Sequence, residues 1–172
     1  MNTERNRRSI RLKGYDYSQS GMYFVTICAQ DRECLFGAII PNGAAPNKIA
    51  LNDAGRMIER EWEKLISRFP YIVLREYIIM PNHFHGIFEI RSDENKATIG
   101  DIVGAFKSIT TAGYIHGVNN DGWQPFCKRL WQRNYYEHIV RNEDEYCQIA
   151  EYIQNNPFNW ENDRENTPCF NS

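Results

Sequence analysis

The sequence predicts one α+β domain built on a mostly antiparallel sheet, and three observations support this prediction. The chain has 172 residues, which suits a single domain. Segments rich in β-branched and aromatic residues come in pairs, and amphipathic segments separate the pairs. The resulting order, β-β-α-β-β-α-β-α, indicates a split β-α-β or ferredoxin-like arrangement with helices mainly on one face.

Five segments have the composition of strands and are bounded by turn residues. The second is expected to be the hairpin partner of the first, and Pro41-Asn42-Gly43 closes that piece of the chain. Pro81-Asn82 is expected to form the tight turn of a second hairpin. The expected strands are residues 22–28, 34–40, 71–80, 83–90 and 130–140.

Three helices are expected, over residues 51–69, 98–116 and 142–156, because apolar residues recur there at three- and four-residue spacing. Asn52 or Asp53 is a suitable N-cap for the first helix. The third is expected to be capped by Asn142, with Glu145 at the reciprocal position. The expected buried positions of the first two are Ile58, Trp62, Leu65 and Ile66, then Ile99, Ile102, Val103, Phe106 and Ile109 or Thr110.

Composition excludes several classes of protein. Hydrophobic residues make up 42% and charged residues 24% of the chain, which is ordinary for a globular domain and argues against disorder. The five cysteines include no C-x-x-C pair, so neither a zinc ribbon nor a thioredoxin-like motif is present. Without an apolar signal segment or a run long enough to span a membrane, a reducing cytoplasm is the expected compartment.

The net charge of −2 is unevenly distributed. Residues 1–13 carry five basic residues against Glu4, so a basic arm is expected over residues 1–20, before a single folded domain over 21–160 and a tail over 161–172. A second basic cluster surrounds Trp131. A near-neutral average therefore does not exclude a nucleic-acid partner. The basic residues of the two clusters are Arg5, Arg7, Arg8, Arg11 and Lys13, then Lys128, Arg129 and Arg133.

His83-Phe84-His85 is the strongest candidate for a metal site. On a strand, residues i and i+2 point to the same face, so both imidazoles can converge on one ion while Phe84 points into the core. The alternative is two histidines that alternate without function. A divalent cation needs a third ligand, and a carboxylate or amide oxygen beside imidazole would suit Mg²⁺ or Mn²⁺ acting on a phosphate.

The last helix offers Tyr152 and Asn156, which lie on one helix face at i and i+4. They could present a phenol and an amide oxygen side by side. The alternative is an amphipathic helix whose tyrosine covers the core and whose Asn155-Asn156-Pro157 ends the helix. Nearby, Tyr135 and Tyr136 are expected in a strand whose alternation buries one of them, so core packing is favoured over catalysis. His138 is interpreted as a sheet residue rather than a partner of a metal ligand.

Three stretches resemble the bacterial REP-associated tyrosine transposases of the IS200-like, single-tyrosine HUH superfamily. The first runs from Arg8-Ser9-Ile10-Arg11-Leu12 through Gly14-Tyr15-Asp16-Tyr17 to Tyr23-Phe24-Val25-Thr26-Ile27-Cys28. The second is Met80-Pro81-Asn82-His83-Phe84-His85-Gly86. The third runs from Leu130-Trp131-Gln132-Arg133-Asn134-Tyr135-Tyr136-Glu137-His138-Ile139 to Tyr152-Ile153-Gln154-Asn155-Asn156-Pro157.

This resemblance implies a metal-dependent strand transferase that cleaves single-stranded, hairpin-forming DNA such as repetitive extragenic palindromes (REP). His83 and His85 match the metal ligands of the family, Tyr152 the nucleophile that forms a 5′-phosphotyrosine, and Asn156 the third ligand. Mg²⁺ or Mn²⁺ is the implied cofactor. In insertion-sequence relatives the last ligand is often Gln, and Asn156 agrees better with the REP-associated branch.

The expected partner is single-stranded or hairpin DNA, and a nucleoid-associated, cytoplasmic monomer or homodimer is expected. The basic arm combines phosphate-binding charge with stacking rings and resembles the family's reader of a short guide sequence. A DNA-hairpin-binding protein without catalysis is the alternative, whereas histidine-triad hydrolases and two-histidine phosphodiesterases lack their further histidines here. The expected DNA contacts are Arg7, Arg8, Arg11, Lys13, Tyr15, Tyr17, Lys107, Lys128, Arg129 and Arg133.

Overall fold

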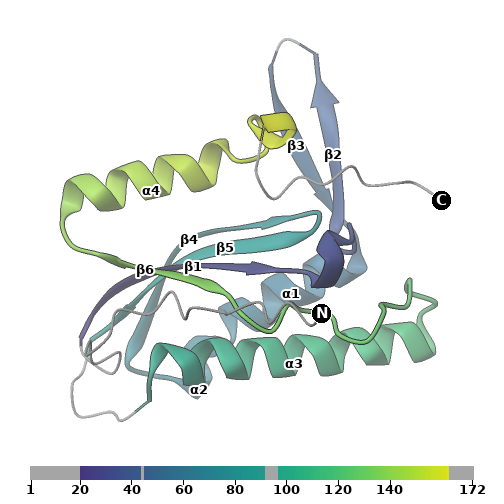
Figure 1. Ribbon diagram of the computed structural model, residues 1–172, viewed down its shortest axis with the longest axis horizontal. Coiled ribbons are helices and arrows are strands. Elements are labelled where there is room, and N and C mark those ends of the chain that lie inside the picture. The colour runs from purple at the N-terminus through teal and green to yellow at the C-terminus, as the bar shows by residue number, and fades with distance from the viewer. Residues whose placement is uncertain (1–19, 44, 92–96, 163–172) are drawn as a thin grey trace, which may run out of the picture.

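Four antiparallel strands form the main sheet of the computed structural model, which describes residues 20–43, 45–91 and 97–162. Their order is β4-β5-β1-β6 (Figure 1). Because β4 and β5 form a hairpin and β5 lies between β1 and β4, the sheet has the split β-α-β arrangement that the sequence predicts. The strands are β1 (Gly21–Cys28), β4 (Ile72–Met80), β5 (His83–Ile90) and β6 (Tyr136–Val140).

Most helices lie on one face of this sheet, as predicted, and the last helix covers the other (Figure 1). The helices are α1 (Asp53–Glu63), α2 (Leu65–Arg68), α3 (Ile99–Asn120) and α4 (Glu143–Asn155), with single 3₁₀ turns η1 (Gln30–Arg32) and η2 (Trp160–Asn162). α1 and α3 pack together beneath the sheet, while α4 packs over β4 and β5.

The main core lies between the sheet and the α1–α3 layer, and aromatic rings fill its centre. Trp62 of α1 lies with its ring centroid 4.6 Å from that of Phe84 and 5.3 Å from that of Phe106. A Cβ at Gly86 would come within 2.7 Å of the Phe84 ring and 2.9 Å of the Trp62 ring. Glycine at this position therefore allows the indole to approach the backbone of β5.

The predicted hairpin between residues 22–28 and 34–40 is wrong. Residues from the second segment belong to β2 (Gly37–Asn42), which pairs with β3 (Ala45–Leu51) in a separate two-stranded sheet that extends from the body (Figure 1). Both edges of β1 are instead taken by β5 and β6. After β1, the chain turns away through Asp31 and Arg32, which both adopt positive φ.

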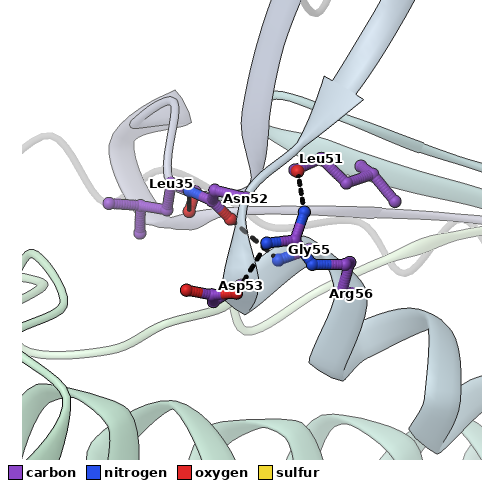
Figure 2. Close-up of polar contacts among 6 residues, drawn as sticks. All are labelled: Leu35, Leu51, Asn52, Asp53, Gly55 and Arg56. Atoms are coloured by element: carbon purple, nitrogen blue, oxygen red, sulfur yellow. Dashed lines mark hydrogen bonds and ion pairs between the residues drawn. The ribbon is translucent and has the colours of Figure 1, made fainter.

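The predicted helix over residues 51–69 is two helices, because Leu51 ends β3 and Lys64 separates α1 from α2. Asn52 is the N-cap: its Oδ1 accepts a hydrogen bond from the Gly55 amide at 2.9 Å (Figure 2). Its Nδ2 also donates to the Leu35 carbonyl at 2.9 Å, which ties the start of α1 to the segment before β2.

The other elements lie close to their predicted positions. α3 starts after its N-cap Thr98 and continues to Asn120, one turn beyond the prediction. β6 is much shorter than the predicted 130–140, because Trp131 forms only an isolated bridge with Ala29. α4 is capped by Asn142, but the Glu145 carboxylate accepts from the Arg141 amide rather than from the cap residue. No helix among the described residues has the length and apolarity needed to cross a membrane.

Candidate active site

His83 and His85 lie side by side on the α4 face of β5, as strand alternation predicts. Both side chains are buried, and their ring centroids are 4.5 Å apart. Phe84, between them, is buried in the opposite core, where it contacts Trp62. The strand therefore holds two imidazoles next to each other on a fixed backbone.

Each histidine has a polar partner that orients its ring. Nδ1 of His83 lies 2.8 Å from Oδ1 of Asn82, and Nδ2 of Asn82 donates to the Arg32 carbonyl at 3.3 Å. Because that second bond leaves Oδ1 of Asn82 as the acceptor, Nδ1 of His83 donates, and in the neutral ring Nε2 has the lone pair. Nδ1 of His85 lies 2.8 Å from the Thr26 hydroxyl on the neighbouring strand.

The environment keeps His85 in its neutral form. Burial, and then the neighbouring His83, lower the pKa of His85 well below its ordinary value. A neutral imidazole has a lone pair to offer a cation, whereas an imidazolium has none. His85 therefore has the protonation state that metal coordination requires.

Tyr152 projects from α4 toward the histidines. Its hydroxyl oxygen lies 3.4 Å from Nε2 of His85, and the two ring centroids are 5.3 Å apart. The side chain of Tyr152 remains 44% exposed, so its hydroxyl lies beside the buried histidine at a surface that a large substrate can reach. The packing of Ile153 against Phe24 and Ile87 holds this part of α4 on the sheet.

Asn156 follows one turn after Tyr152 and is almost completely buried, with 1% of its surface exposed. Neither its amide oxygen nor its amide nitrogen has a hydrogen-bond partner among the described residues. Along the chain it lies between Tyr152, which contacts His85, and Trp160, whose ring stacks on His83 at 6.0 Å. A buried amide without a partner costs free energy, and a cation bound to its oxygen would remove part of that cost.

The described residues contain no group of three or more His, Cys, Asp or Glu side chains that could hold a metal. Any cation bound at the two histidines would therefore need further ligands, for which the amide oxygen of Asn156, an oxygen of the substrate and water are the candidates. Two imidazoles and an amide oxygen fit a cation that accepts nitrogen and oxygen ligands, such as Mn²⁺ or Mg²⁺.

Several neighbours of the site were not predicted. Phe24 stacks on His85 at 5.5 Å and meets Tyr152 edge to face at 6.3 Å. Thr26, Asn82 and Trp160 contact the histidines as described above. Asn82 could have been suspected from its place directly before His83. The other three depend on the pairing of β1 with β5 and on the path after α4, which no local pattern reveals.

The predicted DNA-binding residues fall into two groups. Those of the basic arm lie outside the described residues, so they stay predictions. Lys107, Lys128, Arg129 and Arg133 line one groove of about 590 Å³ between α3 and the segment 126–133, and no acidic residue lines it. Its other lining residues are Ser108, Thr111, Ala112, Ile115, Phe126, Leu130, Trp131 and Gln132.

Lys107 has a structural contact within this groove. Its ammonium group donates to the carbonyls of Gln132 and Arg133 at 2.7 and 3.0 Å and so ties the segment 126–133 to α3. Burial, and then the charge of Arg129, lower the pKa of Lys107. His138 has a structural partner too, because its Nε2 lies 2.7 Å from the Glu145 carboxylate.

Several known proteins are similar to this chain. The family model described as "Transposase IS200 like" matches residues 55–156, a range that includes both histidines, Tyr152 and Asn156. An uncharacterised protein of Haemophilus influenzae is 42% identical over 92% of this chain and 92% of its own length. A second protein of that organism, provisionally named a REP-associated tyrosine transposase, is 22% identical over 83% of this chain and 73% of its own length.

The fold is also that of a solved transposase. The structure of a REP-associated tyrosine transposase bound to a REP hairpin superimposes with a TM-score of 0.59 at 19% identity, covering 87% of this chain and 72% of that one. At this identity the likeness concerns the fold alone. The family match covers more than half of the sequence, and on that ground the chain belongs to the IS200-like transposase family.

Proposed function

We propose that the protein cleaves and rejoins single-stranded DNA at hairpin-forming sites, with Tyr152 as the nucleophile. The contact between the Tyr152 hydroxyl and the His85 imidazole, at 3.4 Å within one chain, is the observation that supports this most directly. Membership of the IS200-like transposase family supports the class of reaction. REP-type hairpins are the proposed substrate, because the related solved transposase is bound to one.

His83, His85 and the amide oxygen of Asn156 are the proposed ligands of a divalent cation, Mg²⁺ or Mn²⁺. When bound, such a cation polarises a phosphodiester oxygen and makes the phosphorus more electrophilic. Asn82 and Thr26 would orient the two imidazoles, since second partners fix the ring and tautomer of a ligating histidine.

In the proposed reaction, the Tyr152 oxygen forms a bond with phosphorus and the bond from phosphorus to the 3′ oxygen breaks. The phenol loses its proton to solvent, and the departing 3′ oxygen gains one. The products are a 5′-phosphotyrosine and a free 3′ hydroxyl, and attack by a 3′ hydroxyl reverses the step. One phosphoester bond replaces another, so no external energy source is needed.

The basic groove between α3 and residues 126–133 is the proposed contact for the DNA backbone in the described part of the chain. Lys128, Arg129 and Arg133 bring three positive charges to a groove that no acidic residue lines. Phosphate contacts position DNA without reading its sequence, so the specificity of the site would depend on other residues. The basic arm, with Arg7, Arg8, Arg11, Lys13, Tyr15 and Tyr17, is the proposed reader of the flanking sequence.

A covalent trapping assay tests the proposal. Purified protein is incubated with a 5′- or 3′-labelled REP-hairpin oligonucleotide in Mn²⁺ or Mg²⁺, and a DNA–protein adduct is sought on a denaturing gel. The wild type should form the adduct, while Tyr152→Phe and metal chelation should abolish it. Tyr146→Phe, on the same helix, is the matched control and should still form it. Hairpin binding without an adduct would favour a DNA-binding protein without catalysis.

A further inference from the structure

We infer that Tyr136 forms a subsite for one unpaired nucleobase beside the reacting phosphate, an inference that rests on the proposed function. Tyr136 is the first residue of β6, and its side chain is 43% exposed. Its hydroxyl makes no hydrogen bond to any described residue, in contrast to Tyr77, Tyr114 and Tyr146, whose hydroxyls bond to a carboxylate or a carbonyl. Within the described part of the chain, no hydrogen bond therefore fixes the Tyr136 ring to the rest of the fold.

The register of the sheet places this ring on the face that carries the histidines. Tyr136 pairs with Thr26 across β1 and β6, and directly paired residues of antiparallel strands point to the same side. Thr26 holds Nδ1 of His85 on that side. Tyr136 on β6, Thr26 on β1 and His85 on β5 therefore form one row across the sheet.

Phe24 joins the Tyr136 ring to the candidate active site. Its ring contacts that of Tyr136 edge to face at 6.2 Å, that of His85 at 5.5 Å and that of Tyr152 at 6.3 Å. Phe24 itself is buried, so among these four rings Tyr136 and Tyr152 are the two with large exposed areas. A DNA strand that brings a phosphate to Tyr152 passes within reach of the Tyr136 ring.

The position of the basic groove just before Tyr136 in the sequence favours DNA as the occupant of the subsite. Arg133, which lines the basic groove, precedes Tyr136 by three residues, so the groove and the ring lie on one continuous stretch of chain. α4 packs over β4 and β5 and leaves this end of β6 accessible. A cationic groove followed along the chain by an exposed aromatic ring offers what single-stranded nucleic acid binds, with phosphates on the charges and a base on the ring.

Binding measurements with and without bases test the subsite. All variants carry Tyr152→Phe so that no DNA is cleaved, and the probes are fluorescein-labelled dT12 and a 12-residue abasic strand. Fluorescence anisotropy gives the Kd of each. Tyr136→Leu should weaken binding of dT12 roughly 5- to 150-fold, the range expected for one stacked base, and leave the abasic strand within about twofold. Tyr136→Phe should bind both probes like its parent.

Arg133→Ala is the matched control, because a lost phosphate contact should weaken both probes equally. The inference is overturned if Tyr136→Leu binds dT12 as tightly as its parent, if it weakens both probes equally, or if the parent does not prefer dT12 to the abasic strand. These results do not depend on adduct formation. Base-dependent binding through Tyr136 without any adduct would refute the proposed function alone, and an adduct without such binding would refute this inference alone.

Discussion

The two faces of the four-stranded sheet are built from alternate residues of the same strands, yet they differ in what they bury. On the face covered by α1 and α3, β1 and β5 contribute apolar side chains, among them Tyr23, Phe84 and Phe88, to one continuous core. On the face covered by α4, the same strands contribute His83, His85 and Thr26, and only a small apolar cluster accompanies them.

Residues that stabilise the fold and residues of the candidate site therefore alternate along the same strands. The rings of the α1–α3 face stabilise the sheet and fix the backbone of β5, while the histidines between them contact residues of the site, among them Thr26, Asn82 and Tyr152. A shift of one residue in the pairing of β5 would move both imidazoles into the apolar core. The core rings therefore help to maintain the register on which the candidate site depends.

Substitution of a core ring should have the largest effect on stability. Phe84→Ala should lower the free energy of unfolding by about 3–5 kcal/mol, because it removes a fully buried ring packed between Trp62 and Phe106. Urea denaturation followed by circular dichroism measures it. His85→Ala, the neighbour on the other face, should cost less, about 1–3 kcal/mol for the lost bond to Thr26. Equal losses would contradict the division between the faces.

Asn156→Leu should stabilise the protein in metal-free buffer, in contrast to Phe84→Ala. Removing two buried amide atoms without partners should raise the free energy of unfolding by about 1 kcal/mol. Mn²⁺ should raise the Tm of the wild type and change that of the variant much less, because only the folded wild type offers the amide oxygen. Thermal unfolding in EDTA and in MnCl₂ measures both effects.

Asn155→Leu provides the matched control for this comparison. Asn155 is the exposed neighbour of Asn156 on α4, so its substitution should leave the response to Mn²⁺ unchanged. If Asn156→Leu destabilises the metal-free protein and still responds to Mn²⁺ like the wild type, the amide is not a ligand.

Local patterns predicted the parts of the site that lie on one element. Alternation along β5 placed the two histidines on one face. The four-residue spacing predicts Tyr152 and Asn156 on one side of the last helix, and in the structure α4 ends at Asn155 with Asn156 as its C-cap. The approach of Tyr152 to His85 could not be predicted, because it depends on how α4 crosses the sheet. Alternation was expected to bury one of Tyr135 and Tyr136, and that Tyr136 is the exposed one became evident only from the position of β6 at the edge of the sheet.

The errors in the predicted fold have a related cause. Strand pairing is a non-local choice, and the segment after β1 was assigned to the nearest strand in sequence although both edges of β1 are filled by β5 and β6. The helical spacing from Ile58 to Ile66 continues across Lys64, where the backbone leaves α1 and begins α2. Apolar spacing alone does not distinguish one helix from two in succession.

Tyr146→Phe should have a smaller effect than Phe84→Ala, because it removes only the bond that fixes α4 to the edge strand β4. The Tyr146 hydroxyl donates to the Glu76 carboxylate at 2.7 Å, and its loss should cost about 1–2 kcal/mol. That bond, and then burial, raise the pKa of Tyr146. Its contribution is therefore complete below about pH 10 and declines as pH rises through the raised pKa. Denaturation at pH 7 and pH 11 should show a smaller difference between variant and wild type at pH 11.

Glu145→Gln should have the smallest effect, because it removes only a charge from the bond between α4 and the other edge strand, β6. Hydrogen bonds, first from the Arg141 amide and then from His138, lower the pKa of Glu145 below its ordinary 4.5. A lowered carboxyl pKa contributes stability above pH 4.5 that is lost as pH falls through the lowered value.

The wild type should therefore exceed Glu145→Gln by roughly 0.5–1 kcal/mol at pH 7, and the difference should shrink as the pH approaches 3, as urea titrations at the two pH values would measure. A difference that grows toward low pH would mean that the carboxylate does not stabilise α4 in its charged form. Glu145 and Tyr146 respond to pH in opposite directions because one is stabilised as an anion and the other as a neutral donor. The helix α4, which carries Tyr152, should thus be most stable on the sheet above the lowered pKa of Glu145 and below the raised pKa of Tyr146. In that pH range both polar contacts with the edge strands are intact.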